Sequence, residues 1–231
     1  MLVFRTRGRG GRYGGSGGGG GLFLDGVTGS ASVVAASAFA SELATEGGAL
    51  SASGAELVVR NNTFASNDAS SRGAHVLLVG DQLTVTNNLV YDGSNTAGLY
   101  LDGAASSGWA ATYNAFFGNA NGDLDSNQGY ALDATNVLAS DPLVVDASVD
   151  CDSDDWFLPG VGSPLFDGGD PGVLDPPGDR SDIGATGGPN ADPAWHGDSD
   201  GDGMGGAVAC VVSCSPTSSS CTSANNVVLT S

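Results

Sequence analysis

In three short segments of the chain, apolar residues stand at every second position of a repeated pattern, and a period of two is the period of a β-strand. The apolar positions, which we expect to face a core, are Leu57 and Val59, Leu83 and Val85, and Trp109 and Ala111. The residues between them, Val58, Thr84 and Ala110, should then lie on the opposite face. Gly, Asn and Asp bound each segment, so the strands are short.

The strand pattern belongs to an internal repeat. Segments that begin alike start at Gly21, Gly48, Gly73 and Gly98, at spacings of 27, 25 and 25 residues. A strand that recurs at this interval without a helix between its copies can stack on its own copy one coil away. The sequence therefore predicts an all-β fold, a right-handed parallel β-helix solenoid of about four to six coils with about 25 residues per coil.

A second column of residues repeats with nearly the same period. Ser37, Asn62, Asn88 and Asn114 follow one another at spacings of 25, 26 and 26 residues. Two residues after each of them comes an apolar side chain, namely Phe39, Phe64, Val90 or Phe116. We expect Asn62, Asn88 and Asn114 to form a structural ladder, in which stacked amides hydrogen-bond to one another at a bend between strands.

The column of glycines also predicts which side chains face outward. With the glycines in register, the inward residues are Leu22 and Leu24, Ala49 and Ser51, Ala74 and Val76, and Leu99 and Leu101. The residues between them form an outward stripe of Phe23, Leu50, His75 and Tyr100. Another segment of the chain could cover this stripe, or the stripe could be a platform on which sugar rings stack.

The regions on either side of the coils differ in composition. Residues 1–19 are rich in Gly and Arg, and we expect a flexible segment there, followed by regular coils over 20–122. Residues 123–190 are dense in turn residues and should form irregular final coils and a cap that closes the solenoid. Residues 191–231 are expected to be a flexible tail. The disulfide connectivity of Cys151, Cys210, Cys214 and Cys221 is open.

The charge of the chain limits its partners. It contains 26 acidic residues, seven arginines and no lysine, for a formal net charge of -19. Such a surface repels nucleic acid and other polyanions, and it favours solubility or the binding of cations. No stretch of the sequence is long and apolar enough to span a membrane.

Several segments resemble the pectin-lyase-like right-handed β-helix repeat proteins of bacterial surfaces. They are NNTF, LTVTNNLVY, YNAFFGN, DPLVVD, GSPLFDGGDP and DRSDIGATGGP, within residues 20–190. The resemblance implies an extracellular or cell-surface module that is structural and binds polysaccharide, although no signal peptide is visible in the chain. We expect a monomer that is part of a longer protein. Because the same fold hosts many activities, the alternative is a polysaccharide lyase or glycoside hydrolase.

The residues needed for catalysis are scarce. Lyases that resemble this chain use Lys or Arg as the base, often with calcium, and here only Arg60, Arg72 and Arg180 lie in or near the coils. Aspartates are abundant, but none stands in the motifs that hydrolases of this fold carry. We therefore assign no catalytic residue.

One segment of the tail resembles a calcium site. Asp198, Asp200 and Asp202 alternate before Gly203, as in the first half of an EF-hand loop. Position twelve would be Ala209 instead of the bidentate Glu, so the segment resembles a degenerate thrombospondin type 3 repeat. Calcium is the one cofactor that the sequence suggests.

Overall fold

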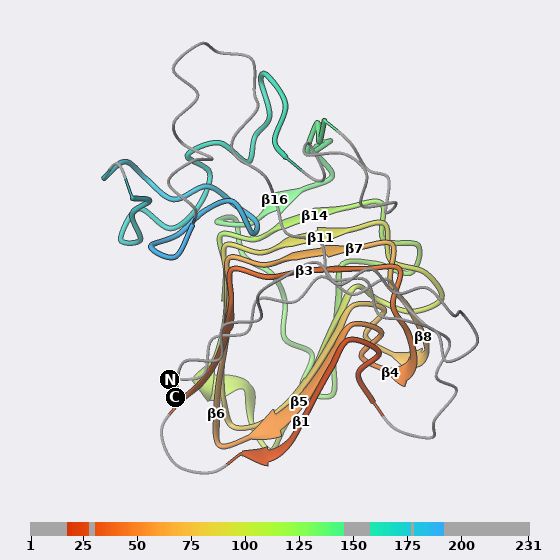
Figure 1. The fold of residues 1–231 in the computed structure, drawn as a ribbon. Coiled ribbons are helices and arrows are strands. Elements are labelled where there is room, and N and C mark those ends of the chain that lie inside the picture. Colours follow the sequence, from red (N-terminus) through yellow and green to blue (C-terminus); the bar gives the residue numbers. More distant parts are fainter. Residues whose placement is uncertain (1–17, 28–30, 146–157, 177, 192–231) are drawn as a thin grey trace, which may run out of the picture.

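The chain folds as a parallel β-solenoid of about four turns. The computed structural model describes residues 18–27, 31–145, 158–176 and 178–191 (Figure 1). The terminal segments, the four cysteines and the candidate calcium ligands Asp198, Asp200 and Asp202 lie outside the described residues. Within them, no helix is long and apolar enough to cross a membrane.

Four parallel sheets run along the solenoid, and we number them 1 to 4. Sheet 1 contains β1 (Leu22–Val27), β5 (Leu50–Gly54), β9 (Val76–Val79), β12 (Leu99–Asp102) and β15 (Leu124–Ser126). Sheet 2 contains β2 (Ser32–Ala35), β6 (Glu56–Arg60), β10 (Gln82–Thr86) and β13 (Trp109–Thr112), the last preceded by a short 3-10 helix, η1 (Ser106–Gly108). Sheet 3 contains β3 (Ala38–Ala40), β7 (Thr63–Ala65), β11 (Leu89–Tyr91), β14 (Ala115–Phe117) and β16 (Val137–Leu138). The small sheet 4 contains β4 (Leu43–Glu46) and β8 (Asp68–Arg72).

The core lies between sheets 1, 2 and 3. In sheet 2, Leu57 pairs with Leu83 and Leu83 with Trp109, and all three side chains are buried, which confirms the predicted inner face. In sheet 3, the rings of Phe39 and Phe64 stack with centroids 5.2 Å apart. In these columns an apolar side chain thus packs on another apolar side chain one coil further along the axis.

The bend between sheets 2 and 3 is held by an asparagine ladder. Asn62 Nδ2 donates to Asn88 Oδ1 at 2.9 Å, and Asn88 Nδ2 donates to Asn114 Oδ1 at 3.0 Å. Asn136 adds a further rung, because its Oδ1 accepts from Asn114 Nδ2 at 3.1 Å. The backbone enters the bend through a left-handed residue, such as Asn61 with φ 49°. The sequence did not reveal Asn136, because it follows Asn114 by 22 residues instead of 26.

The register of sheet 1 differs from the one that the glycine column predicts. Leu22 pairs with Leu50, Leu50 with Val76, and Val76 with Leu99, so these four residues share the inner face. The equivalent turn glycines are Gly19, Gly47 and Gly73, all with positive φ. Aligning Gly48 with Gly73 shifted the second coil by one residue, which exchanges the two faces of a strand. Ser51, predicted to point inward, therefore lies in the outer column with Phe23.

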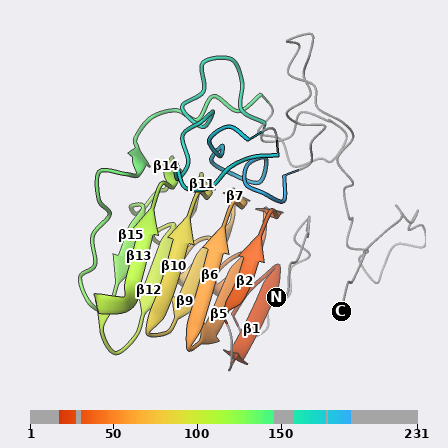
Figure 2. The same ribbon diagram turned by 90° about the vertical axis from the view of Figure 1, so that its left-hand side faces the viewer.

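Residues 158–176 and 178–191 lie against the side of the solenoid, over the outer face of sheet 3 (Figure 2). Leu165 and Ile183 form a small second core with Leu89 and Ala115. Gly184 N donates to the carbonyl oxygen of Asn87 at 2.8 Å. We expected residues 123–190 to form irregular final coils and a cap. Residues 124–138 supply β15 and β16, and Leu124, Tyr130 and Leu132 pack against the main core, whereas the described residues from 158 onward cover a lateral face. Sheet 3 is consequently apolar on both of its faces.

Candidate binding face on sheet 1

The predicted stripe of four residues is only partly a surface. Phe23 is 55% exposed and Tyr100 is half-buried, and both belong to the outer column of sheet 1. Leu50 is fully buried on the inner face, as the corrected register requires. His75 is also fully buried. The prediction that Leu50 and His75 point outward is therefore wrong.

His75 occupies a second ladder inside the bend that follows sheet 3. The successive positions of this bend are Glu42, Asn67, Gly93 and Asn119. Gly93 has no side chain to form a rung, and the His75 ring fills the gap, since a Cβ at Gly93 would lie 2.7 Å from His75 Nε2. His75 is thus a structural replacement for an asparagine.

The hydrogen bonds of His75 define its protonation. Asn67 Nδ2 donates to His75 Nδ1 at 2.9 Å, and His75 Nε2 donates to Asn119 Oδ1 at 3.2 Å. Burial lowers the pKa of His75 to about 3, although the hydrogen bond to Asn119 acts in the opposite direction. The ring is neutral at physiological pH and is not available as a surface acid or base.

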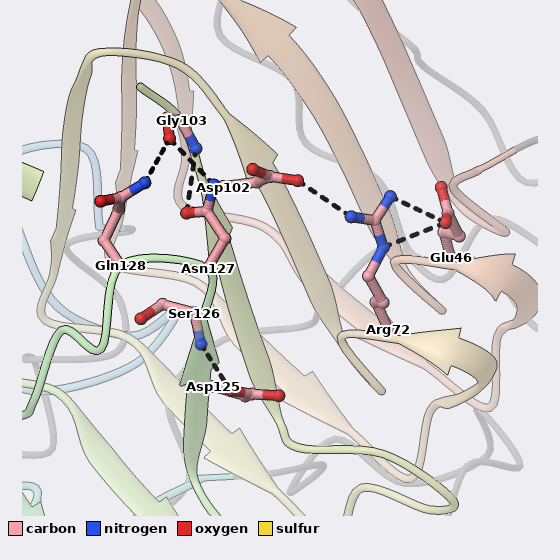
Figure 3. A network of polar contacts seen from close by, with 8 residues as sticks. All are labelled: Glu46, Arg72, Asp102, Gly103, Asp125, Ser126, Asn127 and Gln128. Carbon is pink, nitrogen blue, oxygen red and sulfur yellow. Dashed lines mark hydrogen bonds and ion pairs between the residues drawn. The ribbon is translucent and has the colours of Figure 1, made fainter. Parts of the chain in front are cut away.

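An arginine from sheet 4 reaches onto the outer face of sheet 1. Arg72 donates from Nε and Nη2 to Glu46 Oε1 at 3.0 and 2.8 Å, and from Nη1 to Asp102 Oδ2 at 2.9 Å (Figure 3). Its guanidinium carbon also lies 5.2 Å from the centroid of the Tyr100 ring. The arginine therefore joins residues of three successive coils and covers part of the aromatic surface.

This arrangement keeps Arg72 charged. Burial on its own lowers the pKa of the guanidinium, but the hydrogen bond and charge of Glu46, together with the charge of Asp102, raise it above its ordinary value. A general base must lose its proton to act. Arg72 is therefore unsuited to abstract a proton from a uronate, and it serves as a fixed cation between two carboxylates.

The face continues toward the last coil through a set of fixed amides and a carboxylate. Asn127 Nδ2 and Gln128 Nε2 both donate to the carbonyl oxygen of Gly103 at 2.9 Å (Figure 3). Asp125, which follows Tyr100 in the outer column, accepts from the backbone N–H of Ser126 at 2.7 Å. These contacts orient the polar side chains before any ligand arrives.

Glu46, Asp102 and Asp125 were not predicted to share one face. For Glu46 the sequence does carry a signal, since Glu46 and Arg72 have opposite charges and are 26 residues apart, which is one coil of the repeat. Asp125 lies where the repeat loosens, and its register depends on the pairing of β12 with β15.

The other candidate residues do not gather at this face. Arg60 lies on the outer side of sheet 2, and Arg180 lies in the segment that covers sheet 3. Asp25 accepts a hydrogen bond from Ser53 Oγ at 2.8 Å at the edge of sheet 1. Within the part of the chain that the structure describes, no group of three His, Cys, Asp or Glu side chains is placed to hold a metal ion.

Comparisons with family models, with curated proteins and with solved structures found no match to this chain.

Proposed function

We propose that this chain is a non-catalytic β-solenoid module of a secreted or cell-surface protein. In this proposal the outer face of sheet 1 binds a neutral polysaccharide. The binding surface comprises Phe23 on one side of the buried Ser51 and Leu77, and Tyr100, Arg72 with its carboxylate partners, and Asp125 on the other. The resemblance of the coil sequences to pectin-lyase-like β-helix repeats supports the extracellular setting and the carbohydrate ligand.

The observation that carries the proposal is the position of Arg72 between Glu46 and Asp102. Among the described residues Arg72 is the one cationic side chain on this face, and two carboxylates hold it charged, so the face offers binding groups but no arginine base. The planar polar side chains beside it are already fixed by hydrogen bonds. Groups ordered in advance lose little entropy when they bind the hydroxyls of a sugar.

The charges favour a neutral ligand over a uronate polymer. Among the described residues, Glu46, Asp102 and Asp125 outnumber the single cation Arg72 on this face, and the whole chain has a formal net charge of -19. A polyanion would be repelled both at this surface and at longer range. A neutral chain can place an apolar sugar face on Phe23 and its hydroxyls on the polar groups.

Affinity electrophoresis tests the proposal. Migration of the protein is measured in native gels that contain neutral xylan, glucan or mannan, and in gels that contain polygalacturonate. We expect retardation by a neutral polymer, weakened by Phe23→Ala and by Asp125→Ala. The loss for the aromatic ring should be roughly 0.5–1.5 kcal/mol of binding free energy.

Phe166→Ala is the matched control, because Phe166 is 48% exposed, close to the 55% of Phe23, but lies in the segment over sheet 3. It should leave the retardation unchanged. Equal effects of the two phenylalanine substitutions, or retardation by polygalacturonate alone, would overturn the assignment of the face.

The alternative of a carbohydrate-active enzyme is tested with the same polymers. Reducing ends report hydrolysis, and the ultraviolet absorbance of an unsaturated product reports elimination, each with and without calcium. We expect no turnover in either assay. Turnover that Arg72→Ala or Asp125→Asn abolishes would make this face an active site.

A further inference from the structure

Two arginines of this acidic protein have no carboxylate partner among the described residues. The ion pairs of that part of the chain both involve Arg72, and neither Arg60 nor Arg180 takes part in one. Unpaired cations are unexpected where acidic side chains outnumber basic ones by 26 to seven. The two residues come from distant parts of the chain, and the fold brings them to the same edge of the solenoid.

Arg60 ends β6 on the outer side of sheet 2. Its backbone pairs with Thr86, and Thr86 pairs with Thr112, so the three side chains form one column across successive coils. The Oγ1 atoms of the two threonines are 3.5 Å apart. Arg60 Nε is buried and has no hydrogen-bond acceptor within the described residues, which is costly for a charged donor.

Arg180 reaches the same edge from the segment that covers sheet 3. Ser181, the next residue, accepts a hydrogen bond from Asn61 Nδ2 at 3.0 Å, directly beside Arg60. The guanidinium of Arg180 lies 5.8 Å from the centroid of the Tyr113 ring, next to Thr112. Arg180 Nε donates to the carbonyl oxygen of Gly169 at 2.6 Å. Its Nη2 donates to the carbonyl oxygen of Gly168 at 3.4 Å. The side chain is thereby held by a ring and two carbonyl groups instead of by an acid.

We propose that Arg60 and Arg180, together with the hydroxyl group of Thr112, bind an oxyanion such as sulfate. Tyr113 lies two coils beyond Arg60, about 10 Å along the axis, so the column of Thr86 and Thr112 runs from Arg60 to the coil in which Arg180 contacts Tyr113. Guanidinium N–H groups match the oxygens of sulfate and carboxylate, and a threonine hydroxyl donates to the same oxygens. This site lies on sheet 2 and is independent of the face on sheet 1.

The oxyanion can be a free ion or a substituent of a larger molecule such as a sulfated glycan. The overall negative charge repels a long polyanion. At 0.1 M ionic strength salt largely screens this repulsion at separations beyond roughly 10 Å. We therefore expect a sulfated oligosaccharide to bind only where the salt concentration is moderate or high, whereas the small ion binds with less dependence on salt.

Nuclear magnetic resonance of the arginine Nε–H groups tests the site in the unmutated chain. Sodium sulfate is titrated against sodium chloride at equal ionic strength, and Arg→Gln variants assign the signals of Arg60, Arg72 and Arg180. We expect saturable shifts of the Arg60 and Arg180 signals. Arg72 is an internal control, because Glu46 and Asp102 hold its guanidinium at sheet 1, away from the threonine column of sheet 2, and its signal should not move.

The variants give the second measurement. Arg60→Gln and Arg180→Gln should each weaken sulfate binding by about tenfold, seen at the signal of the remaining arginine. Tighter binding of a sulfated oligosaccharide than of sulfate identifies a glycan as the source of the group, and equal binding identifies the free ion. A response of only one of the two arginines, or equal linear shifts of all three, would overturn the proposal.

Discussion

Asn67 Nδ2 donates a hydrogen bond to Nδ1 of His75, with the two atoms 2.9 Å apart in the interior of the solenoid. The ring occupies the position of a missing asparagine in a ladder whose next rung is Asn119. An imidazole can do this only while it is neutral, because the protonated ring has no acceptor for the Asn67 amide. Protonation of His75 is therefore coupled to the stability of the fold.

We predict that His75 makes the protein less stable in acid. The pKa of the ring is near 6.5 in the unfolded chain and about 3 in the folded chain. Between these values the unfolded state binds a proton that the folded state does not, so the free energy of unfolding decreases as the pH falls. The decrease is about 1.4 kcal/mol for each unit of pKa difference, and the contribution is complete above pH 6.5.

Urea unfolding of the unmutated protein and of His75→Gln at pH 7 and pH 4.5 measures this effect. Gln is neutral at both values and retains one donor and one acceptor group. At pH 7 the variant should have a lower free energy of unfolding than the unmutated protein. Between pH 7 and pH 4.5 this free energy should fall by less in the variant. An equal loss in both proteins would mean that His75 does not titrate with unfolding.

Glu42 should have the opposite effect on pH dependence. Its side chain is 5% exposed in the first coil, and burial raises its pKa from 4.5 to about 7. The folded state retains a proton that the unfolded state releases above pH 4.5, so stability decreases as the pH rises from 4.5 to 7. Glu42→Gln should therefore stabilise the protein at pH 8, by roughly 1–3 kcal/mol.

The control for Glu42 is Glu56→Gln on the outer face of sheet 2, where the carboxylate is exposed. This substitution should leave the thermal midpoint at pH 8 almost unchanged. If both variants raise the midpoint equally, the gain reflects a lower net charge instead of the burial of Glu42.

The period of the sequence was sufficient to predict the solenoid, but it did not determine the faces of every strand. In sheet 2 the alternation around Leu57, Leu83 and Trp109 is regular, and the predicted faces are confirmed. In sheet 1 two adjacent glycines precede β5, and choosing Gly48 instead of Gly47 placed Leu50 on the surface. A difference of one residue in a turn is small in the sequence, yet it exchanges the inward and outward faces of the strand that follows.

Contacts without a period could not be inferred from the repeat. The ring of His75 and Asn119 are 44 residues apart, which does not correspond to a whole number of coils. Asn61 and Ser181 are 120 residues apart and join the solenoid to a segment with no repeat of its own. Such pairs depend on where a segment without a repeat packs on the coils. The place of packing depends on the whole outer surface of the folded coils, which the repeat pattern alone does not describe.

The stacked aromatic core gives a further prediction. Phe64 is fully buried and stacks on Phe39, whereas Thr84 lies on the outer face of sheet 2. Phe64→Ala should lower the free energy of unfolding by about 3–5 kcal/mol, because it removes apolar contacts and leaves a cavity. Thr84→Ala should change it by no more than about 0.5 kcal/mol. Denaturant midpoints decide between these values, and similar shifts would contradict the assigned faces.

Two glycines with positive φ, Gly47 in the turn before β5 and Gly26 within β1, provide the last prediction. Gly47 has φ 57°, and a Cβ at this position would collide with the carbonyl oxygen of Leu50, whereas Gly26, with φ 62°, has no atom within 4 Å of such a Cβ. Gly26→Ala should therefore cost only the left-handed backbone strain, about 1–2 kcal/mol, and Gly47→Ala should cost clearly more because the turn must also move. Thermal or urea unfolding of the two variants measures the difference, and the shared backbone strain cancels in the comparison. Equal losses of unfolding free energy would show that the turn at Gly47 can move to accept a Cβ at no further cost. The register that places Leu50 inside would then lack this steric support.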